Sequence, residues 1–437
     1  MKRILFIGVI LIVFLSGISA QIYVPIDTAN LETRKTISTK HKEASKQYIT
    51  YLKKTLTGSE KSYIVKEFDT DQKDFNKELL HGDYIFDNRF DLIVDSLVDI
   101  LQKGNTEITD DLKFYISRNI SLNASSLGDK TFVINLGSFY YFDNENEMAA
   151  IIAHEIGHLL LNHKVETMKR HLQFDKTDAK ADITVIRNEK YNRGTKALER
   201  YKSILYRNGS LNKKQEHEAD SIGYVLYNRA KFKKADFLNA YNLMAEYDTI
   251  KPKGLMPETY RKVFDLPNQP FKEEWMKRED FSSYDYSKYK EKFDEDSLKS
   301  HPEIAERIAY LKTLFPELAQ SENPTKPDSS FIKIQRIAHF ERPASLDFNE
   351  EYGFGIYLCL TQLQKDSTDA YHRAWLGHFF RKVYDARKAY TLNRYLDRLE
   401  PKEQSESYQQ FLSFMWNMNI TELKTIADYY EKPLANK

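Results

Sequence analysis

The sequence predicts a mostly helical α+β protein with a small β-sheet in its first half and a helical C-terminal part. Three observations support this fold class. Apolar residues recur at three- and four-residue steps over several stretches, a spacing that is typical of amphipathic helices. Two runs rich in β-branched and aromatic residues, 113–120 and 131–136, have the composition of strands. A proline-containing segment, 321–330, separates these elements from a further series of helical patterns.

Residues 1–20 have the composition of a cleavable signal peptide. Lys2 and Arg3 supply positive charge, residues 4–15 are apolar or glycine, and small residues precede a cleavage position after Ala20. The alternative is an uncleaved anchor helix, but the apolar run is short for the ~20 residues that a membrane span requires. We therefore expect an exported protein, periplasmic or peripheral at the envelope if the source is a Gram-negative bacterium.

The composition excludes several classes of protein. Lys plus Arg is 65 and Asp plus Glu is 64, so no basic excess points to a nucleic-acid partner. Cys359 is the only cysteine, which rules out an intramolecular disulfide and a metal site built from cysteines. Beyond residue 20 no apolar run is long enough to cross a bilayer. The length predicts two or three domains at ~150 residues each.

The sequence before residue 144 predicts helices and a pair of strands. Residues 21–76 are polar and charged, and are expected to form an N-terminal helical accessory segment that covers the rest; the alternative is a pro-segment. An amphipathic helix follows, with its apolar positions between Phe90 and Leu101. The strands are expected at 113–120 and 131–136, on either side of a small-residue loop at 123–129.

A single helix is predicted over residues 144–163. Asn144 can cap its first turn, and Glu147 stands three residues later, as in a capping box. Apolar residues at helical spacing indicate that one face is buried; they are Met148, Ile151, Ile152 and Leu159.

The same helix carries the pattern His-Glu-x-x-His at 154–158. Residues four apart share a helix face, so His154 and His158 can bind one metal ion. Glu155 is rotated by about 100° from His154, beside the open position of the metal, where it can take a proton from a metal-bound water. This is the pattern of zinc peptidases, and it predicts one zinc ion per chain. The alternative is a pair of ordinary helix histidines.

The charged segment after this helix is expected to hold a separate helix near 196–206, and it could serve as a lid. Another helix is predicted to begin at Gln215. There the sequence offers candidates for the third protein ligand that a catalytic zinc requires.

Glu216 and Asp220 lie four residues apart and share a face of that helix. Glu216 can reach the metal, while Asp220 can hold a ligand imidazole through the ring nitrogen that faces away from the metal. His217 and Glu218 are competing ligands because both side chains can bind metal. The plainer alternative is an exposed acidic helix start.

The strand before the metal-binding helix is predicted to have an open edge. Such an edge can pair with an extended peptide and hold the scissile bond over the metal. The alternative is a plain core strand. The residues expected to bind substrate are Thr131, Phe132, Val133, Ile134 and Asn135.

Together these motifs resemble the HtpX-like zinc metallopeptidases, a family that also holds the CAAX prenyl proteases and the periplasmic BepA-type proteases. The resemblance covers about half of the chain. Asn123-Ala124, the strand and turn at 131–142, and the zinc helix occur in family order. Glu216 and Asp220 match the Glu-x-x-x-Asp motif of the family. The resemblance implies a gluzincin domain, here 77–318, with Glu216 as third ligand and Glu155 as general base.

A His-Pro pair followed by an Arg extends the resemblance at His301, Pro302 and Arg307. It implies that His301 lies near the zinc, where it covers the metal or contacts the reacting carbonyl. In the expected mechanism, either His301 or Arg307 could assist the oxyanion. The alternative is a histidine at a helix entrance. A long insert, 247–299, departs from the family pattern. The membrane helices of two family branches are also missing, which favours the soluble exported branch and argues against a prenylated substrate.

A linker at 319–330 is predicted to precede a helical C-terminal domain at 331–437. Five residues stand at the spacings of one ~34-residue tetratricopeptide unit. Two alternatives remain for this domain: a short repeat-like module that binds partners, and a generic helical cap. The five residues are Leu376, Gly377, Phe380, Ala389 and Pro401.

These inferences combine into one expected function. The chain is predicted to be a zinc-dependent endopeptidase of the cell envelope, which hydrolyses unfolded or unassembled envelope proteins in quality control. Glu155 would activate the zinc-bound water for this reaction. The alternative is a non-enzymatic, zinc-stabilised chaperone or scaffold that binds envelope proteins through its helical C-terminus. Glu155 argues against that alternative, because a structural zinc site needs no general base.

Overall fold

The protein is described by a computed structural model that covers residues 23–26, 30–173, 193–249, 254–278, 303–320, 323–327, 329–399 and 404–431. Of residues 193–209 only the backbone is described. The predicted signal peptide, His301 and Pro302 lie outside these residues. In the described part of the chain, no helix is long and apolar enough to span a membrane.

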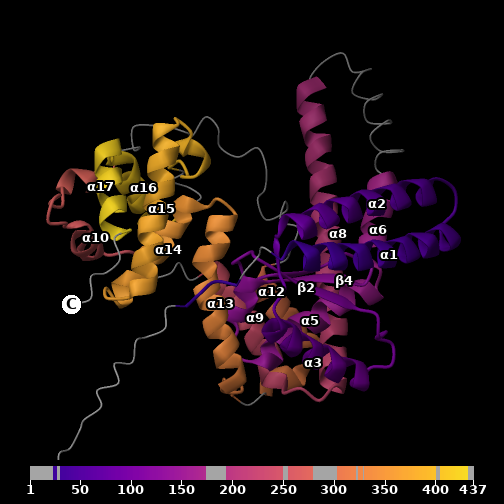
Figure 1. The fold of residues 1–437 in the computed structure, drawn as a ribbon. Helices are drawn as coiled ribbons and strands as arrows, with labels where there is room; N and C mark the ends of the chain where they lie inside the picture. Colours follow the sequence, from indigo (N-terminus) through magenta and orange to yellow (C-terminus); the bar gives the residue numbers. More distant parts are fainter. Residues whose placement is uncertain are drawn as a thin grey trace, which may run out of the picture.

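The predicted fold class is confirmed, because helices dominate and surround one small mixed sheet (Figure 1). The sheet has the strand order β1-β2-β4-β3. β2 and β4 are parallel, while β1 and β3 pair antiparallel with β2 and β4. The strands are β1 (Tyr84–Ile85), β2 (Lys113–Ser117), β3 (Ala124–Ser126) and β4 (Thr131–Asn135).

The prediction that the strand at Thr131–Asn135 has an open edge is wrong. β4 lies inside the sheet, with β2 on one side and β3 on the other, so its backbone is already paired. The edge strand on this side of the sheet is β3, a three-residue strand in what the sequence suggested was a loop. Thr131, Phe132, Val133, Ile134 and Asn135 therefore cannot form the predicted backbone pairing with a substrate.

Each face of the sheet is covered by a different set of helices. Phe132 and Ile134 point into the main core, beside α3 (Asn88–Gly104) and α5 (Glu145–Leu160). On the other face, Phe75 packs edge-on against Tyr115, with ring centroids 5.1 Å apart. Phe75 belongs to a hairpin of α1 (Leu31–Thr55) and α2 (Gly58–His81). The accessory segment predicted for residues 21–76 is thus a helical cover over the sheet.

Helix α5 lies where a single helix was predicted over residues 144–163, with one difference at each end. At its start the Asn144 side chain accepts a hydrogen bond from the Glu147 N–H at 3.1 Å. The Glu147 carboxylate accepts from the Asp143 N–H, at 2.6 Å, and from the side-chain amide of Asn144, at 3.0 Å, rather than from the backbone N–H of the cap residue. The helix ends at Leu160, and α6 (His163–Gln173) begins after a turn.

Helix α8 (Arg193–Arg229) is one continuous helix of 37 residues that packs along α5. Residues 196–206 are helical, as predicted, but the prediction that another helix begins at Gln215 is wrong. Asn208 and Gly209 read as a turn, but packing of the second half of α8 against α5 overrides this local preference. The other helices of this part are α4 (Leu136–Tyr141), α9 (Lys234–Thr249), α12 (Ile304–Leu314) and the 3-10 turn η5 (Pro316–Gln320).

A second core lies in the C-terminal part of the chain and forms a separate group of helices in Figure 1. It also contains residues from 254–278, with Tyr260, Phe264 and Trp275 fully buried in it. This packing differs from the predicted division, which placed that segment in the 77–318 domain. The elements are α10 (Pro257–Phe264), η2 (Glu273–Met276), α13 (Ser329–Phe348), α14 (Tyr352–Lys365), α15 (Ala370–Lys388), η6 (Leu392–Arg394), α16 (Glu406–Asn417) and α17 (Ile420–Tyr430).

The suggested tetratricopeptide unit is not formed. Such a unit needs two helices joined by a turn within its ~34 residues. α15 instead runs unbroken from Ala370 to Lys388, and the short η6 is the only helical segment in the described residues 389–399. The C-terminal part is a helical lobe without this repeat.

Candidate metal centre

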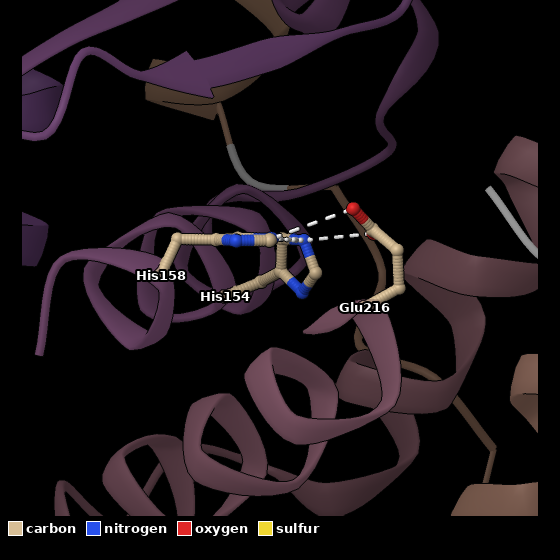
Figure 2. A group of neighbouring side chains, drawn as sticks. All are labelled: His154, His158 and Glu216. Carbon is tan, nitrogen blue, oxygen red and sulfur yellow. Dashed lines mark hydrogen bonds and ion pairs between the residues drawn. The ribbon is translucent and has the colours of Figure 1, made fainter. Parts of the chain in front are cut away.

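The two histidines of α5 and one glutamate of α8 converge on a common point (Figure 2). The Nε2 atoms of His154 and His158 are 3.1 Å apart. Each Nε2 lies 3.6 Å from a carboxylate oxygen of Glu216. Among the described residues, these three side chains form a group that could hold a metal ion, with ligand atoms all within 4.8 Å of one another.

The donor set fits a zinc ion. Tetrahedral zinc with ligands at ~2.0–2.1 Å separates its ligand atoms by about 3.3 Å. The observed separations of 3.1 and 3.6 Å bracket that value. Two imidazole nitrogens and one carboxylate oxygen also match the ligand types of catalytic zinc sites. The role of the three residues as ligands stays a prediction.

Two glycines let α8 approach α5 closely enough for this geometry. A Cβ added at Gly157 would lie 2.9 Å from the carbonyl oxygen of Ala219. A Cβ added at Gly223 would lie 2.9 Å from the Cα of His154. Because the neighbours are backbone atoms, larger residues would push the two helices apart. The helix that carries Glu216 is therefore held against the helix that carries both histidines.

Asp220 fixes the orientation of His154. Its carboxylate lies 2.9 Å from His154 Nδ1, which leaves Nε2 turned toward the common point. Arg307, on α12, donates from Nε and Nη2 to the same carboxylate at 2.9 and 2.5 Å. The Tyr241 hydroxyl, on α9, donates to it at 2.7 Å. Asp220 is thus a buried hub that four helices share.

The charges of this hub stabilise one another. Burial alone would raise the pKa of Asp220, but the Arg307 charge and the hydrogen bonds from His154 and Arg307 bring it far below its ordinary value. Burial lowers the pKa of His154, but the hydrogen bond to Asp220 and the negative charges of Asp220 and Glu216 together outweigh burial and raise this pKa. Burial raises the pKa of Tyr241 well above its ordinary range, so its hydroxyl keeps the proton it donates.

His158 also has a partner on its Nδ1. The Nδ1 of His163, the first residue of α6, lies 2.9 Å away. On its other side, the His163 Nε2 lies 3.3 Å from a carboxylate oxygen of Glu218. Burial and the neighbouring His154 lower the pKa of His158 to about 3, so its ring is neutral and carries a lone pair for a metal.

Glu155 stands next to the common point. One of its carboxylate oxygens lies 4.0 Å from His154 Nε2. Burial raises the pKa of Glu155, with His154 opposing this shift and Glu216 adding to it. A carboxylate with a raised pKa accepts a proton more readily, which suits a general base.

A cleft of about 710 Å³ opens over these groups. Its floor includes His154, Glu155 and Glu216. The residues of β3 form part of its wall. Apolar side chains also line the cleft; they include Phe142, Ile151, Met244 and Ile304.

The structure brings most of the sequence-predicted site residues together. His154, Glu155, His158 and Glu216 surround one point, and Asp220 and Arg307 lie behind it. The competing candidates point elsewhere. His217 packs on the ring of Tyr310 at 4.3 Å, and Glu218 contacts His163. His301 lies outside the described residues, so its predicted place near the zinc stays a prediction.

The expected oxyanion role of Arg307 does not match its surroundings. The side chain is 4 % exposed and its guanidinium is engaged by Asp220 and by Glu216, which lies 3.4 Å from Nη1. These contacts make Arg307 a residue that positions Asp220 and Glu216.

Sequence reasoning missed Tyr241, His163 and the strand β3. His163 had one available signal, since it is a metal-capable residue five positions after His158. Tyr241 gave no signal, because a lone tyrosine on a helix is most often a core residue.

Comparison with known proteins agrees with this geometry. Residues 93–314, just over half of the chain, match the sequence model of Peptidase family M48. The chain belongs to peptidase family M48. Membership in M48 confirms the predicted resemblance to HtpX-like and CAAX prenyl protease-like zinc metallopeptidases. It identifies the chain as a metallopeptidase whose substrates are peptides or proteins. No curated protein sequence matches the chain.

Proposed function

We propose that this protein is a zinc-dependent endopeptidase of the cell envelope that cleaves unfolded polypeptides. The observation that carries the proposal is the convergence of His154, His158 and Glu216 beside Glu155, at the base of a cleft. A structural zinc site is closed by four protein ligands, whereas this group offers three and has a general base next to it.

Different residues of the chain have different roles in the proposed hydrolysis. Zinc bound by the three ligands would supply Lewis-acid activation of the peptide carbonyl and of the attacking water. Glu155 takes the proton from that water and passes it to the nitrogen of the leaving amine. Asp220 holds the His154 ring by its Nδ1, and Arg307 keeps Asp220 ionised and Glu216 in place. These fixed positions favour the reactive geometry.

The edge strand β3 supports binding of an extended substrate. In the register with β4, Ser125 is paired with Val133, and Leu127 donates to Thr131 at 2.8 Å. Antiparallel pairing alternates, so the N–H and C=O groups of Ala124 and Ser126 point away from β4. These outward groups lie in the wall of the cleft and can pair with a substrate backbone.

This mode of binding favours unfolded proteins and internal cleavage. A substrate must be extended over several residues to pair with an edge strand, which folded proteins rarely allow. Backbone pairing needs no free terminus. Together with the signal-like residues 1–20, these features support quality control of envelope proteins in the periplasm, as in the BepA-type branch. The C-terminal lobe would then present bound partners to the site.

Cleavage of reduced, alkylated casein by full-length, zinc-loaded protein tests the proposal. Glu155→Gln keeps the size of the side chain and removes the base, so the rate of cleavage should fall by about 10²–10⁴-fold. Glu166→Gln makes the same change at an exposed position on α6 and should keep wild-type activity. Mass spectrometry should locate the cuts inside the substrate. Equal cleavage by wild type and Glu155→Gln would contradict the mechanism and favour a chaperone or scaffold.

A further inference from the structure

His163 and Glu218 form a chain of contacts behind His158 that none of the motifs includes. The ring nitrogens His158 Nδ1 and His163 Nδ1 are 2.9 Å apart, and His163 Nε2 lies 3.3 Å from Glu218 Oε2. The His163 side chain is 7 % exposed, while that of Glu218 is 42 % exposed. Lys214 lies 3.5 Å from the other oxygen of Glu218.

A tight turn places His163 against His158. Helix α5 ends at Leu160, and Asn162 adopts a left-handed backbone conformation with φ at 52°. Asparagine is one of the few residues other than glycine that tolerate this conformation. The chain then starts α6 at His163, whose ring meets that of His158 with centroids 4.9 Å apart.

The hydrogen bonds allow one consistent set of proton positions. For His158 Nε2 to present a lone pair to a metal, the proton of the neutral ring must be on Nδ1. His158 Nδ1 then donates to His163 Nδ1, which must accept. The His163 proton is consequently on Nε2, where it is donated to the carboxylate of Glu218. Each contact in the chain therefore has one donor and one acceptor.

The arrangement around His158 parallels the one around His154. Asp220 accepts directly from His154 Nδ1, at 2.9 Å. His158 reaches its carboxylate, Glu218, through one intervening imidazole. Both carboxylates lie on α8, as does Glu216. One helix thus supplies a metal-binding carboxylate and the groups that orient both histidines.

We propose that His163, with Glu218 behind it, is a positioning residue that fixes the tautomer and orientation of His158 for zinc binding. This inference rests on the zinc site of the proposed function. Partners on the far nitrogen of a ligand histidine hold its ring and raise its basicity, and their loss typically lowers metal affinity 10- to 100-fold. His163 acts through His158 and does not itself reach the metal-binding group in the described structure.

Two substitutions of similar size separate positioning from packing. His163→Asn keeps an acceptor oxygen near the place of Nδ1, while His163→Leu has a similar branched shape and no acceptor. Zinc affinity of the full-length proteins should be measured by competition with a chromogenic chelator. His163→Leu should bind zinc about 10- to 100-fold more weakly than wild type, and His163→Asn should recover most of that loss.

Three further variants complete the experiment. His171→Ala removes an exposed histidine from the same helix, α6, and should bind zinc like wild type. Glu216→Ala removes a direct ligand and should bind zinc more weakly than any His163 variant. Glu218→Gln changes only the outer, half-exposed end of the chain, and should lower zinc affinity even if His163→Leu does not fold.

Thermal unfolding of the zinc-free proteins and cobalt spectra supply independent readouts. If positioning is the role, His163→Leu and His163→Asn should unfold at similar temperatures without metal, yet differ in zinc affinity and in the visible absorption of bound Co²⁺. Equal zinc affinity of wild type, His163→Leu and Glu218→Gln, with a clear loss in Glu216→Ala, would overturn the positioning role alone. Failure of wild type to bind zinc would overturn the metal site itself.

Discussion

Asp220 is a fully buried carboxylate that stays ionised because its neighbours compensate its charge. Arg307 gives it two hydrogen bonds, His154 contacts it through Nδ1, and the Tyr241 hydroxyl donates a further hydrogen bond to it. A buried ion pair contributes little net stability as a whole, but removing one partner leaves the other uncompensated. Single residues behind the metal centre are therefore important for the stability of the protein, although they lie away from the reacting groups.

Arg307→Met should destabilise the protein by about 3–5 kcal/mol, because it leaves the Asp220 carboxylate buried without its cation. Urea unfolding of the zinc-free protein measures this loss. Arg261→Met is the matched control, since Arg261 makes a two-bond pair with Glu273 at the surface and should change the unfolding midpoint far less. A loss of stability no larger than that of the control would show that Arg307 does not compensate Asp220.

The sequence predicted the site residues that belong to a motif, and it missed the site residues whose position depends on tertiary packing. His154, Glu155, His158, Glu216 and Asp220 stand at helical spacings, and such spacing alone places side chains on one face. Which helix supplies a hydroxyl to Asp220 depends on tertiary packing. The contact between Tyr241 and Asp220 joins two helices and follows from no local pattern.

The close contact between helices α5 and α8 determines whether the three metal-binding side chains can meet. It depends on Gly157 and Gly223, whose added Cβ atoms would each lie 2.9 Å from backbone of the opposite helix. Backbone cannot move aside as a flexible side chain can, so a substitution here moves a whole helix. Glu216 would move with α8.

Gly223→Ala should lower the free energy of unfolding by about 1–3 kcal/mol, despite the better helix propensity of alanine, because the contact is overpacked. It should also weaken zinc binding, which chelator competition can measure. Asn228→Ala changes an exposed residue of the same helix and should leave both properties unchanged. Wild-type zinc affinity in Gly223→Ala would mean that the helix contact does not set the ligand geometry.

A second prediction concerns the edge strand β3. Ser126→Pro removes the N–H that points away from β4, so cleavage of unfolded substrates should fall sharply with an increase in KM. Steady-state kinetics with a fluorogenic peptide measures the change. Ser126→Ala keeps the backbone N–H and should cleave like wild type. Similar losses in both variants would assign the effect to the hydroxyl and not to backbone pairing.

The sequence could not predict β3 for a physical reason. Its three residues, Ala124–Ser126, have small side chains with no preference for strands. The strand exists because its backbone pairs with β4, whose strong β composition is visible in the sequence. The open edge was therefore assigned to β4, the strand with the recognisable pattern, although β3 covers it. The sequence also predicts a new helix from Gln215, but packing against α5 continues α8 through this position.

Across the whole molecule, α13 links the two cores. Phe331, Ile334 and Ala338, in its first half, are buried in the core of the metal centre, and Leu346, near its end, is buried in the C-terminal core. The segment before it is also held, since the Thr325 N–H and hydroxyl both donate to Asp236 at 2.6 Å. The predicted linker is thus anchored to the peptidase part where it is described.

Removal of residues 329–437 should leave a protein that does not fold stably. It would expose the apolar surface that α13 covers, and it would strip Tyr260, Phe264 and Trp275 of their core. Such exposed apolar patches cause aggregation. Size-exclusion chromatography and thermal unfolding of the truncated protein test this expectation. A monomer that unfolds cooperatively and cleaves casein like wild type would show that the two cores are independent.

The predicted domain boundaries could not foresee this interdependence. Sequence order placed 254–278 with the peptidase motifs on either side of it. In the structure the segment joins the C-terminal helices, for example through the Tyr430 hydroxyl, which donates to the Val263 carbonyl at 2.6 Å. A fold class can be predicted from local periodicity, but the distribution of helices between two cores depends on contacts between residues distant in sequence.

The central claim is that His154, His158 and Glu216 bind one zinc ion and that Glu155 acts as the general base beside it. A crystal structure of the zinc-loaded protein, with anomalous data collected on both sides of the zinc edge, tests it most directly. One peak should lie at ~2.0–2.2 Å from Nε2 of each histidine and from a Glu216 oxygen. Glu155 should lie beside the ion without being a protein ligand. A peak at His217 or Glu218, or no peak at this site, would contradict the claim.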